Sequence, residues 1–150
     1  MKKKLFLILM VVMCFIMMVS AADNSMKATH VSVDIVVNED NSFNITETIG
    51  IYFYTPHHGI IRNLPLINTV KRADGTSSTN YAKVSAINCN EQYTTDTEGS
   101  DLVIQIGDPD VTVTGSKQYV LKYHYDIGND PLKDIDELYF NAIGTEWTYS

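Results

Sequence analysis

The stretch FNITETIGIYFY, Phe43 to Tyr54, decides the fold class because its apolar side chains recur at every second residue. That period is typical of a β-strand with one buried face. Glu47 stands at one of the alternating positions, so a carboxylate is predicted to point toward the core. The positions on this face are Phe43, Ile45, Glu47, Ile49, Ile51 and Phe53.

The preceding stretch, HVSVDIVVN at 30–38, shows the same alternation. It places Val31, Val33, Ile35 and Val37 on one face. The turn-forming residues NEDNS (38–42) separate the two stretches. We therefore predict that they form an antiparallel hairpin with one face buried.

Further short strands are predicted along the chain, separated by segments rich in turn-forming residues. Strands spaced by about 8–12 residues favour an all-β fold, and we predict an antiparallel β-sandwich of the immunoglobulin-like, two-sheet kind. Because Trp147 and Tyr149 suit a strand that has just begun, we expect the domain to continue beyond Ser150. The segment RADGTSSTN (72–80) is expected to be a loop, and DIDELYF (134–140) fits either a last strand or a short helical turn. The predicted strands are YAKVSAIN (81–88), LVIQIG (102–107) and KQYVLKYHY (117–125).

The first 22 residues have the pattern of a secretory signal peptide. Lys2–Lys4 precede an apolar run of 15 residues, Leu5 to Val19, and small residues follow at 20–22. A membrane span usually needs about 17–25 apolar residues, so an uncleaved anchor is the weaker alternative. Both interpretations place residues 23–150, as one domain, on the extracytoplasmic side.

Residues 23–150 are predicted to be strongly acidic. Three of the 11 basic residues are Lys2–Lys4, so eight basic and 18 acidic residues remain, a net charge near −10. Such a surface repels phosphate backbones, and no nucleic-acid partner is expected. Cys89 is the single cysteine left after Ala22, so the domain is expected to be held by its core and not by an internal disulfide.

The adjacent residues His57 and His58, in TPHHGIIRNLP (55–65), suggest a metal or catalytic site. Neighbouring side chains on a strand point to opposite faces, and a zinc site needs three or four ligands. The acidic turns at 39–40, 108–110 and 134–137 lack the calcium-binding loop pattern, and the known motifs of hydrolases are absent. We therefore expect no cofactor, no metal ligands and no catalytic residues.

Arg62 is the most informative polar residue of this stretch. It is surrounded by Ile60, Ile61 and Leu64, and an unpaired buried charge is costly. We predict that it pairs with Glu47 or Glu137 and fixes a loop onto the sheet. The alternative is an exposed arginine whose stem lies on apolar surface.

The order of several spaced motifs resembles a known family. Five segments resemble, in this order, the N-terminal domain of the predicted membrane proteins called domain of unknown function 2207 (DUF2207). They are Thr46-Glu47, where the family pattern is V-x-E, GIIRNLP at 59–65, IGD at 106–108, the strand at 119–125 and a last motif from Glu137 to Trp147. The resemblance implies an extracytoplasmic β-sandwich followed by membrane helices, and it implies no reaction. Its motif residues are Glu47, Gly59, Arg62, Pro65, Gly107, Glu137 and Trp147.

Two functions follow from these observations. The first is a non-catalytic binding or assembly module of the bacterial cell envelope, with an envelope protein or ligand as its partner. In that case the motif residues are mainly architectural, and the membrane is reached only through the signal segment or through downstream helices. The alternative is an envelope metal-binding module or hydrolase that uses His57, His58 and nearby carboxylates.

Overall fold

The computed structural model describes residues 25–72 and 74–128, and these residues form strands and connecting turns with no helix. All strand pairs are antiparallel. The prediction of an all-β, antiparallel fold is confirmed. The strands are β1 (Met26–Val37), β2 (Ser42–His57), β3 (Ile60–Pro65), β4 (Ile67–Lys71), β5 (Ser77–Tyr81), β6 (Lys83–Cys89), β7 (Tyr93–Glu98), β8 (Asp101–Ile106) and β9 (Val113–Asp126).

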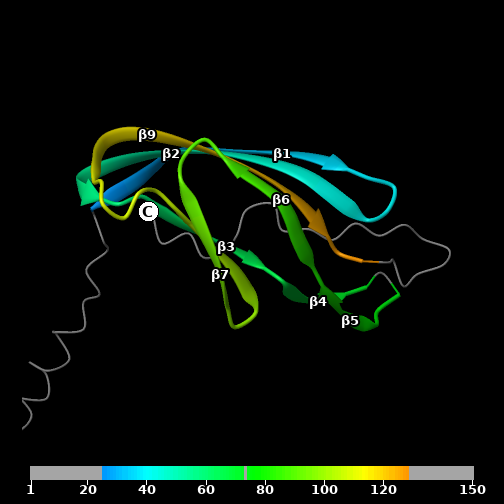
Figure 1. Ribbon diagram of the computed structural model, residues 1–150. Coiled ribbons are helices and arrows are strands. Elements are labelled where there is room, and N and C mark those ends of the chain that lie inside the picture. The colour runs from blue at the N-terminus through cyan, green and yellow to red at the C-terminus, as the bar shows by residue number, and fades with distance from the viewer. Residues whose placement is uncertain (1–24, 73, 129–150) are drawn as a thin grey trace, which may run out of the picture.

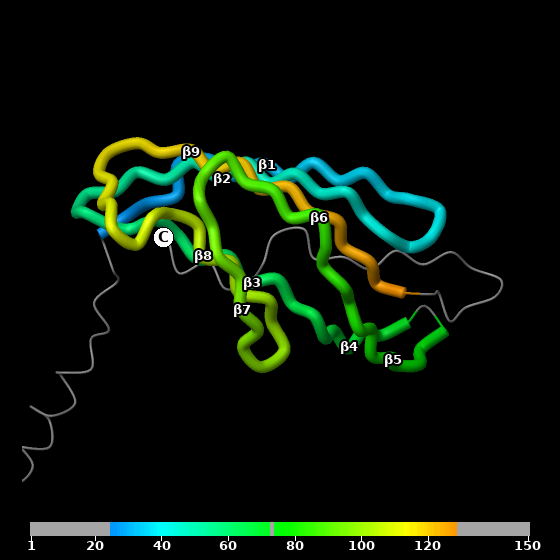
Figure 2. The backbone as a smooth tube through the Cα atoms, in the orientation of Figure 1, coloured from blue at the N-terminus to red at the C-terminus, as the bar shows by residue number. Residues whose placement is uncertain are grey.

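The strands form two larger sheets and a separate hairpin. The four-stranded sheet has the order β1-β2-β9-β6, the three-stranded sheet has the order β3-β8-β7, and β4 pairs with β5. Figure 1 shows the four-stranded sheet as the upper layer, with β3, β7 and the β4–β5 hairpin below it. Figure 2 follows the same path and adds β8 to the lower layer. An immunoglobulin-like arrangement is not confirmed by this order and stays a prediction.

The predicted hairpin is formed by β1 and β2. Val37 lies opposite Phe43, and Val33 lies opposite Glu47. The turn is closed by a hydrogen bond from Asn38 N to Ser42 O at 2.9 Å. Asp40 accepts hydrogen bonds from the backbone and hydroxyl of Ser42, and these bonds lower the pKa of Asp40 below its ordinary value.

The inner faces of β2 and β9, which pair along nearly their whole length, supply most of the buried core side chains, and β3 and β8 supply others. Each residue of the strand at 119–125 therefore pairs with a residue 70 or more positions earlier in the chain. The two strands of the predicted hairpin differ in burial. Every predicted inner position of β2 is buried. The inner positions of β1, which is the edge strand, are half-buried or exposed. The core side chains of β2 and β9 are Phe43, Ile45, Ile49, Ile51, Phe53, Tyr119, Leu121, Tyr123 and Tyr125.

Two segments that were expected to be loops are strands. Within GIIRNLP, residues 60–65 form β3, in which Ile60, Arg62 and Leu64 are buried and the residues between them are more exposed. The sequence did not reveal this strand because one of its inward-facing residues is an arginine. Residues 72–80 contribute β5, which pairs with β4 although its side chains are mostly Ser, Thr and Asn.

Gly59 and Gly107 lie against each other where β3 begins and β8 ends. Both have positive φ angles, 141° and 139°. A Cβ atom on Gly59 would lie 1.9 Å from the carbonyl oxygen of Ile106, and one on Gly107 would lie 1.9 Å from that of His58. Two glycines of the motifs are therefore required by a close approach of two backbones.

We expect Gly59→Ala to destabilise the domain by at least about 2 kcal/mol, because the methyl group overlaps a backbone carbonyl and the φ angle is unfavourable. Gly99→Ala is the matched control: Gly99 has φ 59°, yet a Cβ there meets nothing within 4 Å. Its cost should be about 1 kcal/mol, from the backbone angle alone. Urea unfolding measures both variants. Equal losses at the two positions would contradict a role for the close approach.

Candidate functional site

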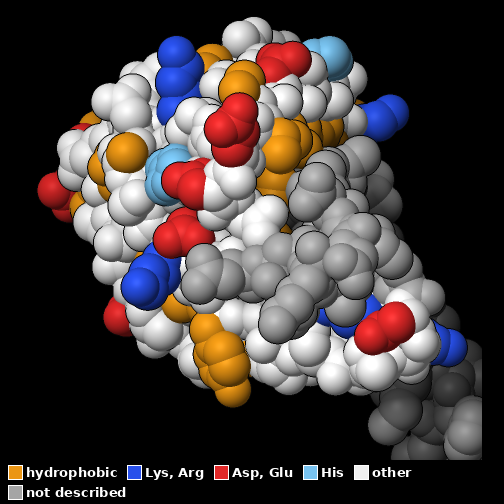
Figure 3. Space-filling view, turned by 90° about the vertical axis from the view of Figure 1, so that its right-hand side faces the viewer, with side chains coloured by type: hydrophobic (Ala, Val, Ile, Leu, Met, Phe, Trp, Pro, Cys, Tyr) orange, Lys and Arg blue, Asp and Glu red, His pale blue; other side chains and the backbone are white. Residues whose placement is uncertain are grey.

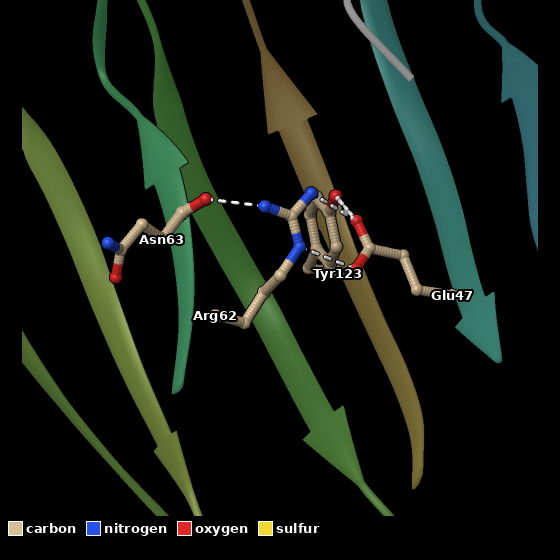
Figure 4. Close-up of polar contacts among 4 residues, drawn as sticks. All are labelled: Glu47, Arg62, Asn63 and Tyr123. Carbon is tan, nitrogen blue, oxygen red and sulfur yellow. Dashed lines mark hydrogen bonds and ion pairs between the residues drawn. The ribbon is translucent and has the colours of Figure 1, made fainter. Parts of the chain in front are cut away.

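The polar cluster that the sequence pointed to is a buried ion pair between the two sheets. Arg62, on β3, donates from Nε to Glu47 Oε2 at 2.7 Å and from Nη2 to Glu47 Oε1 at 2.8 Å. The two side chains are 8% and 1% exposed, respectively. Figure 4 shows the guanidinium of Arg62 reaching from its own strand to the carboxylate on β2. The predicted pairing of Arg62 with Glu47 is present, and an exposed Arg62 is wrong.

Two further hydrogen bonds complete this cluster. The hydroxyl of Tyr123, on β9, donates to Glu47 Oε1 at 2.6 Å. Arg62 Nη1 donates to the carbonyl oxygen of Asn63 at 2.6 Å. Glu47 thus accepts three hydrogen bonds, which a buried carboxylate needs to offset its lost hydration. Tyr123 was placed on the correct face by its period in the sequence, but its contact with Glu47 was not foreseen.

The cluster changes the proton affinities of its members. Burial alone would lower the pKa of Arg62, but the hydrogen bonds and charge of Glu47 outweigh it and raise that pKa above its ordinary value. Burial raises the pKa of Tyr123 strongly, and the neighbouring charge of Glu47 raises it further. Arg62 therefore stays protonated, and Tyr123 stays a hydrogen-bond donor, at any physiological pH.

His57 and His58 have separate partners. His57 Nε2 lies 3.0 Å from the hydroxyl of Ser25, and its Nδ1 lies 2.8 Å from the carbonyl oxygen of Thr55. His58 is exposed, and its Nδ1 lies 3.3 Å from the carbonyl oxygen of Val111. His57 thus ties the start of β1 to the end of β2, a role that the sequence did not indicate.

Nothing in residues 25–72 and 74–128 groups three or more histidine, cysteine or acidic side chains closely enough to hold a metal ion. The carboxylate of Asp108 accepts a hydrogen bond from the backbone nitrogen of Asp110 at 2.8 Å, and so closes its own turn. Asp40 has the same kind of role in the β1–β2 turn. These acidic residues are parts of turns.

A second buried arginine, which the sequence analysis missed, lies in the β4–β5 hairpin. Arg72 is 6% exposed. Its Nε donates to the hydroxyl of Ser78 and its Nη2 to the side-chain oxygen of Asn80, both at 2.6 Å. The only signal in the sequence was an arginine next to a segment rich in side-chain oxygens.

The other motif residues are placed as follows. Pro65 ends β3, and its carbonyl oxygen accepts a hydrogen bond from the hydroxyl of Tyr125. Gly107 follows β8 and donates from its backbone nitrogen to Gln92 O at 2.8 Å. Glu137 and Trp147 lie outside the described residues, and so does the predicted strand or turn at 134–140.

We expect Arg62→Met to cost about 3–5 kcal/mol of stability, because it leaves Glu47 charged and buried without its cation. The double variant Glu47→Leu, Arg62→Met should regain most of that loss. Lys117→Met is the control, since Lys117 pairs with Glu91 at 2.7 Å but the two side chains are about one-third exposed. It should cost about 1 kcal/mol or less. Urea unfolding that finds Arg62→Met no worse than Lys117→Met would contradict the role of the ion pair.

We also expect the stability of the protein to fall as pH rises above about 10. Tyr123 has a pKa raised above its ordinary value of 10.0, so the unfolded chain loses this proton while the folded chain keeps it. Tyr123→Phe should lower the slope of stability against pH by up to about 1.4 kcal/mol per pH unit. Burial also raises the pKa of Tyr125, which should account for part of the remaining slope. Tyr54→Phe, at an exposed position, is the control. An unchanged slope in Tyr123→Phe would show that Tyr123 ionises freely.

Comparison with known proteins identifies a family. No curated protein and no solved structure matches the chain. Within the described residues, no helix is long and apolar enough to cross a membrane. The family profile described as the N-terminal domain of a predicted membrane protein (DUF2207) matches residues 27–150, which confirms the resemblance seen in the motifs. The chain therefore belongs to the DUF2207 N-terminal domain family of predicted membrane proteins.

Proposed function

We propose that this chain is a non-catalytic binding or assembly domain of a membrane-associated protein, located on the extracytoplasmic side. The observation that carries the proposal is the use made of Glu47 and Arg62. Their charged groups are buried, paired with each other and joined to Tyr123. A carboxylate that already accepts three hydrogen bonds in the core serves to hold the sheets together, so the motif residues support an architectural role.

The proposed location rests on the N-terminal pattern and on the family. Lys2–Lys4 followed by an apolar run is typical of an export signal, and the family is one of predicted membrane proteins. A bacterial envelope protein or ligand as partner, and an immunoglobulin-like form of the sandwich, are parts of the same proposal. The acidic composition supports a partner that is not itself strongly acidic.

The location is tested by fusing alkaline phosphatase, which is active only outside the cytoplasm, after Ser150 of the full chain. We expect an active fusion. The double substitution Leu9→Arg, Val11→Arg interrupts the apolar run and should abolish the activity at equal protein level. Val36→Arg, at an exposed position outside that run, is the control and should keep it. An inactive fusion of the unchanged chain would contradict the extracytoplasmic location.

Two further measurements on the chain distinguish a binding module from the metal-dependent alternative. Cross-linking in intact cells is expected to trap one discrete complex, and a chain that stays monomeric would contradict a binding or assembly role. Zinc, calcium or a chelator should leave the melting temperature of the purified chain unchanged. A metal-induced rise that disappears in His57→Ala and His58→Ala would overturn the non-catalytic proposal in favour of the metal-binding alternative.

A further inference from the structure

The outer face of the four-stranded sheet carries two exposed tyrosines, Tyr52 and Tyr54, which we call the tyrosine patch. They stand two positions apart on β2, so both side chains point away from the smaller sheet. They are 40% and 59% exposed, and their ring centroids lie 5.0 Å apart with the ring planes at 60°. In Figure 1 the four-stranded sheet is the upper layer, and none of the described strands lies above it. The two rings therefore present an aromatic surface to water.

The strand register places polar side chains around the tyrosine patch. Lys27 of β1 and Ser116 of β9 lie opposite Tyr52, one on either side of it. In the next row, His30 and Gln118 lie on either side of a glycine of β2. All four residues are exposed, and none of their side chains makes a hydrogen bond with another described residue. The patch is thus bordered by ammonium, hydroxyl, imidazole and amide groups that can bind the polar atoms of a ligand.

The charge around the tyrosine patch differs from that of the whole chain. The chain has 18 acidic residues, but none occupies an outward position of β2 or of β9 between 116 and 124. Asp34 and Asp126 belong to the same side of the sheet, but they pair with residues of β2 that lie about 20 Å or more from Tyr52 along the strand. Figure 3, which views the molecule from the end with the β1–β2 turn, shows several acidic side chains at that distant end.

This distribution of charge favours an uncharged ligand at the tyrosine patch. A cationic ligand would meet Lys27 there and no carboxylate on the neighbouring outward positions of β2 and β9. An anionic ligand would be repelled by the net charge of the chain, −7. A second copy of the chain is disfavoured for the same reason. The ligand should therefore be neutral, with apolar surface for the tyrosine rings and polar groups for the side chains beside them.

We propose that the outer face of β2 and β9 binds a neutral polysaccharide, with sugar rings stacked on Tyr52 and Tyr54. The C–H groups on one side of a pyranose ring form an apolar surface with partial positive charge, which the negatively polarised face of an aromatic ring attracts. Stacking removes both surfaces from water, and the sugar hydroxyl groups can exchange hydrogen bonds with Ser116, His30 and Gln118. Because the two tyrosines are adjacent, consecutive sugar units can each contact one of them. This inference rests on the proposed binding role and names the ligand of that role.

Native gels cast with mixed-linkage β-glucan, galactomannan or glycol chitin, which are all uncharged, test the proposal with the full chain. A gel with polygalacturonate provides the charged comparison. We expect at least one neutral polymer to retard the chain. Tyr52→Ala and Tyr54→Ala should each weaken the affinity for that polymer about tenfold, whereas Tyr52→Phe keeps the ring and should retain the affinity. Tyr81→Ala is the matched control, since Tyr81 is 69% exposed but lies on β5, away from this face.

The variants are expected to fold because the tyrosines are exposed, and far-ultraviolet circular dichroism checks this. The proposal is overturned if no neutral polymer retards the unchanged chain, if polygalacturonate alone does so, or if Tyr52→Ala and Tyr81→Ala lose affinity equally. A discrete cross-linked complex in cells without retardation by a neutral polymer would show that the sugar ligand is wrong while the binding role stands. The absence of both would overturn the ligand and the proposed binding role together.

Discussion

The alignment of the small sheet on the large one depends on the ion pair between Glu47 and Arg62, because the pair places two charges inside a mainly apolar core. Removing both groups from water is expensive, and the cost is offset only by close bidentate geometry and by the added hydrogen bonds of Tyr123 and Asn63. If β3 shifted by one residue, Arg62 would turn outward and Glu47 would remain buried without its cation. The pair therefore penalises wrong alignments of the small sheet on the large one far more than apolar packing alone would.

The other motif residues of TPHHGIIRNLP act on the same strand. Gly59 allows the beginning of β3 to approach the end of β8, and the carbonyl of Pro65 accepts the hydroxyl of Tyr125 at the other end. Arg62 holds the middle. Three separate contacts thus fix β3 at its start, centre and end. This explains physically why glycine and arginine belong to one motif, whereas the contact of Pro65 uses a backbone carbonyl that any residue would supply.

The sequence predicted the features that arise from local periodicity and from the cost of a buried charge. The strands around Phe43 to Phe53 and Tyr119 to Tyr125 were clear from their alternation, and Glu47 on an apolar face required a cation. The sequence did not predict the strands in which alternation of apolar and polar residues is hidden. Arg62 occupies an inward position of β3, and β5 is built from Ser, Thr and Asn. The pairing of β2 with β9 is non-local, and no residue pattern within either strand specifies its neighbour.

The burial of β1 shows a further limit of periodicity. Alternation correctly assigns Val31 to Val37 to the inner side of the sheet, but it says nothing about whether another layer faces them. That depends on the widths of the two sheets, and the described part of the structure places three strands against four. The edge strand consequently keeps apolar side chains half-buried, while the inward-facing side chains of its neighbour β2 are buried. The inner face of β1 is therefore one of the places where the described strands leave apolar side chains in contact with water.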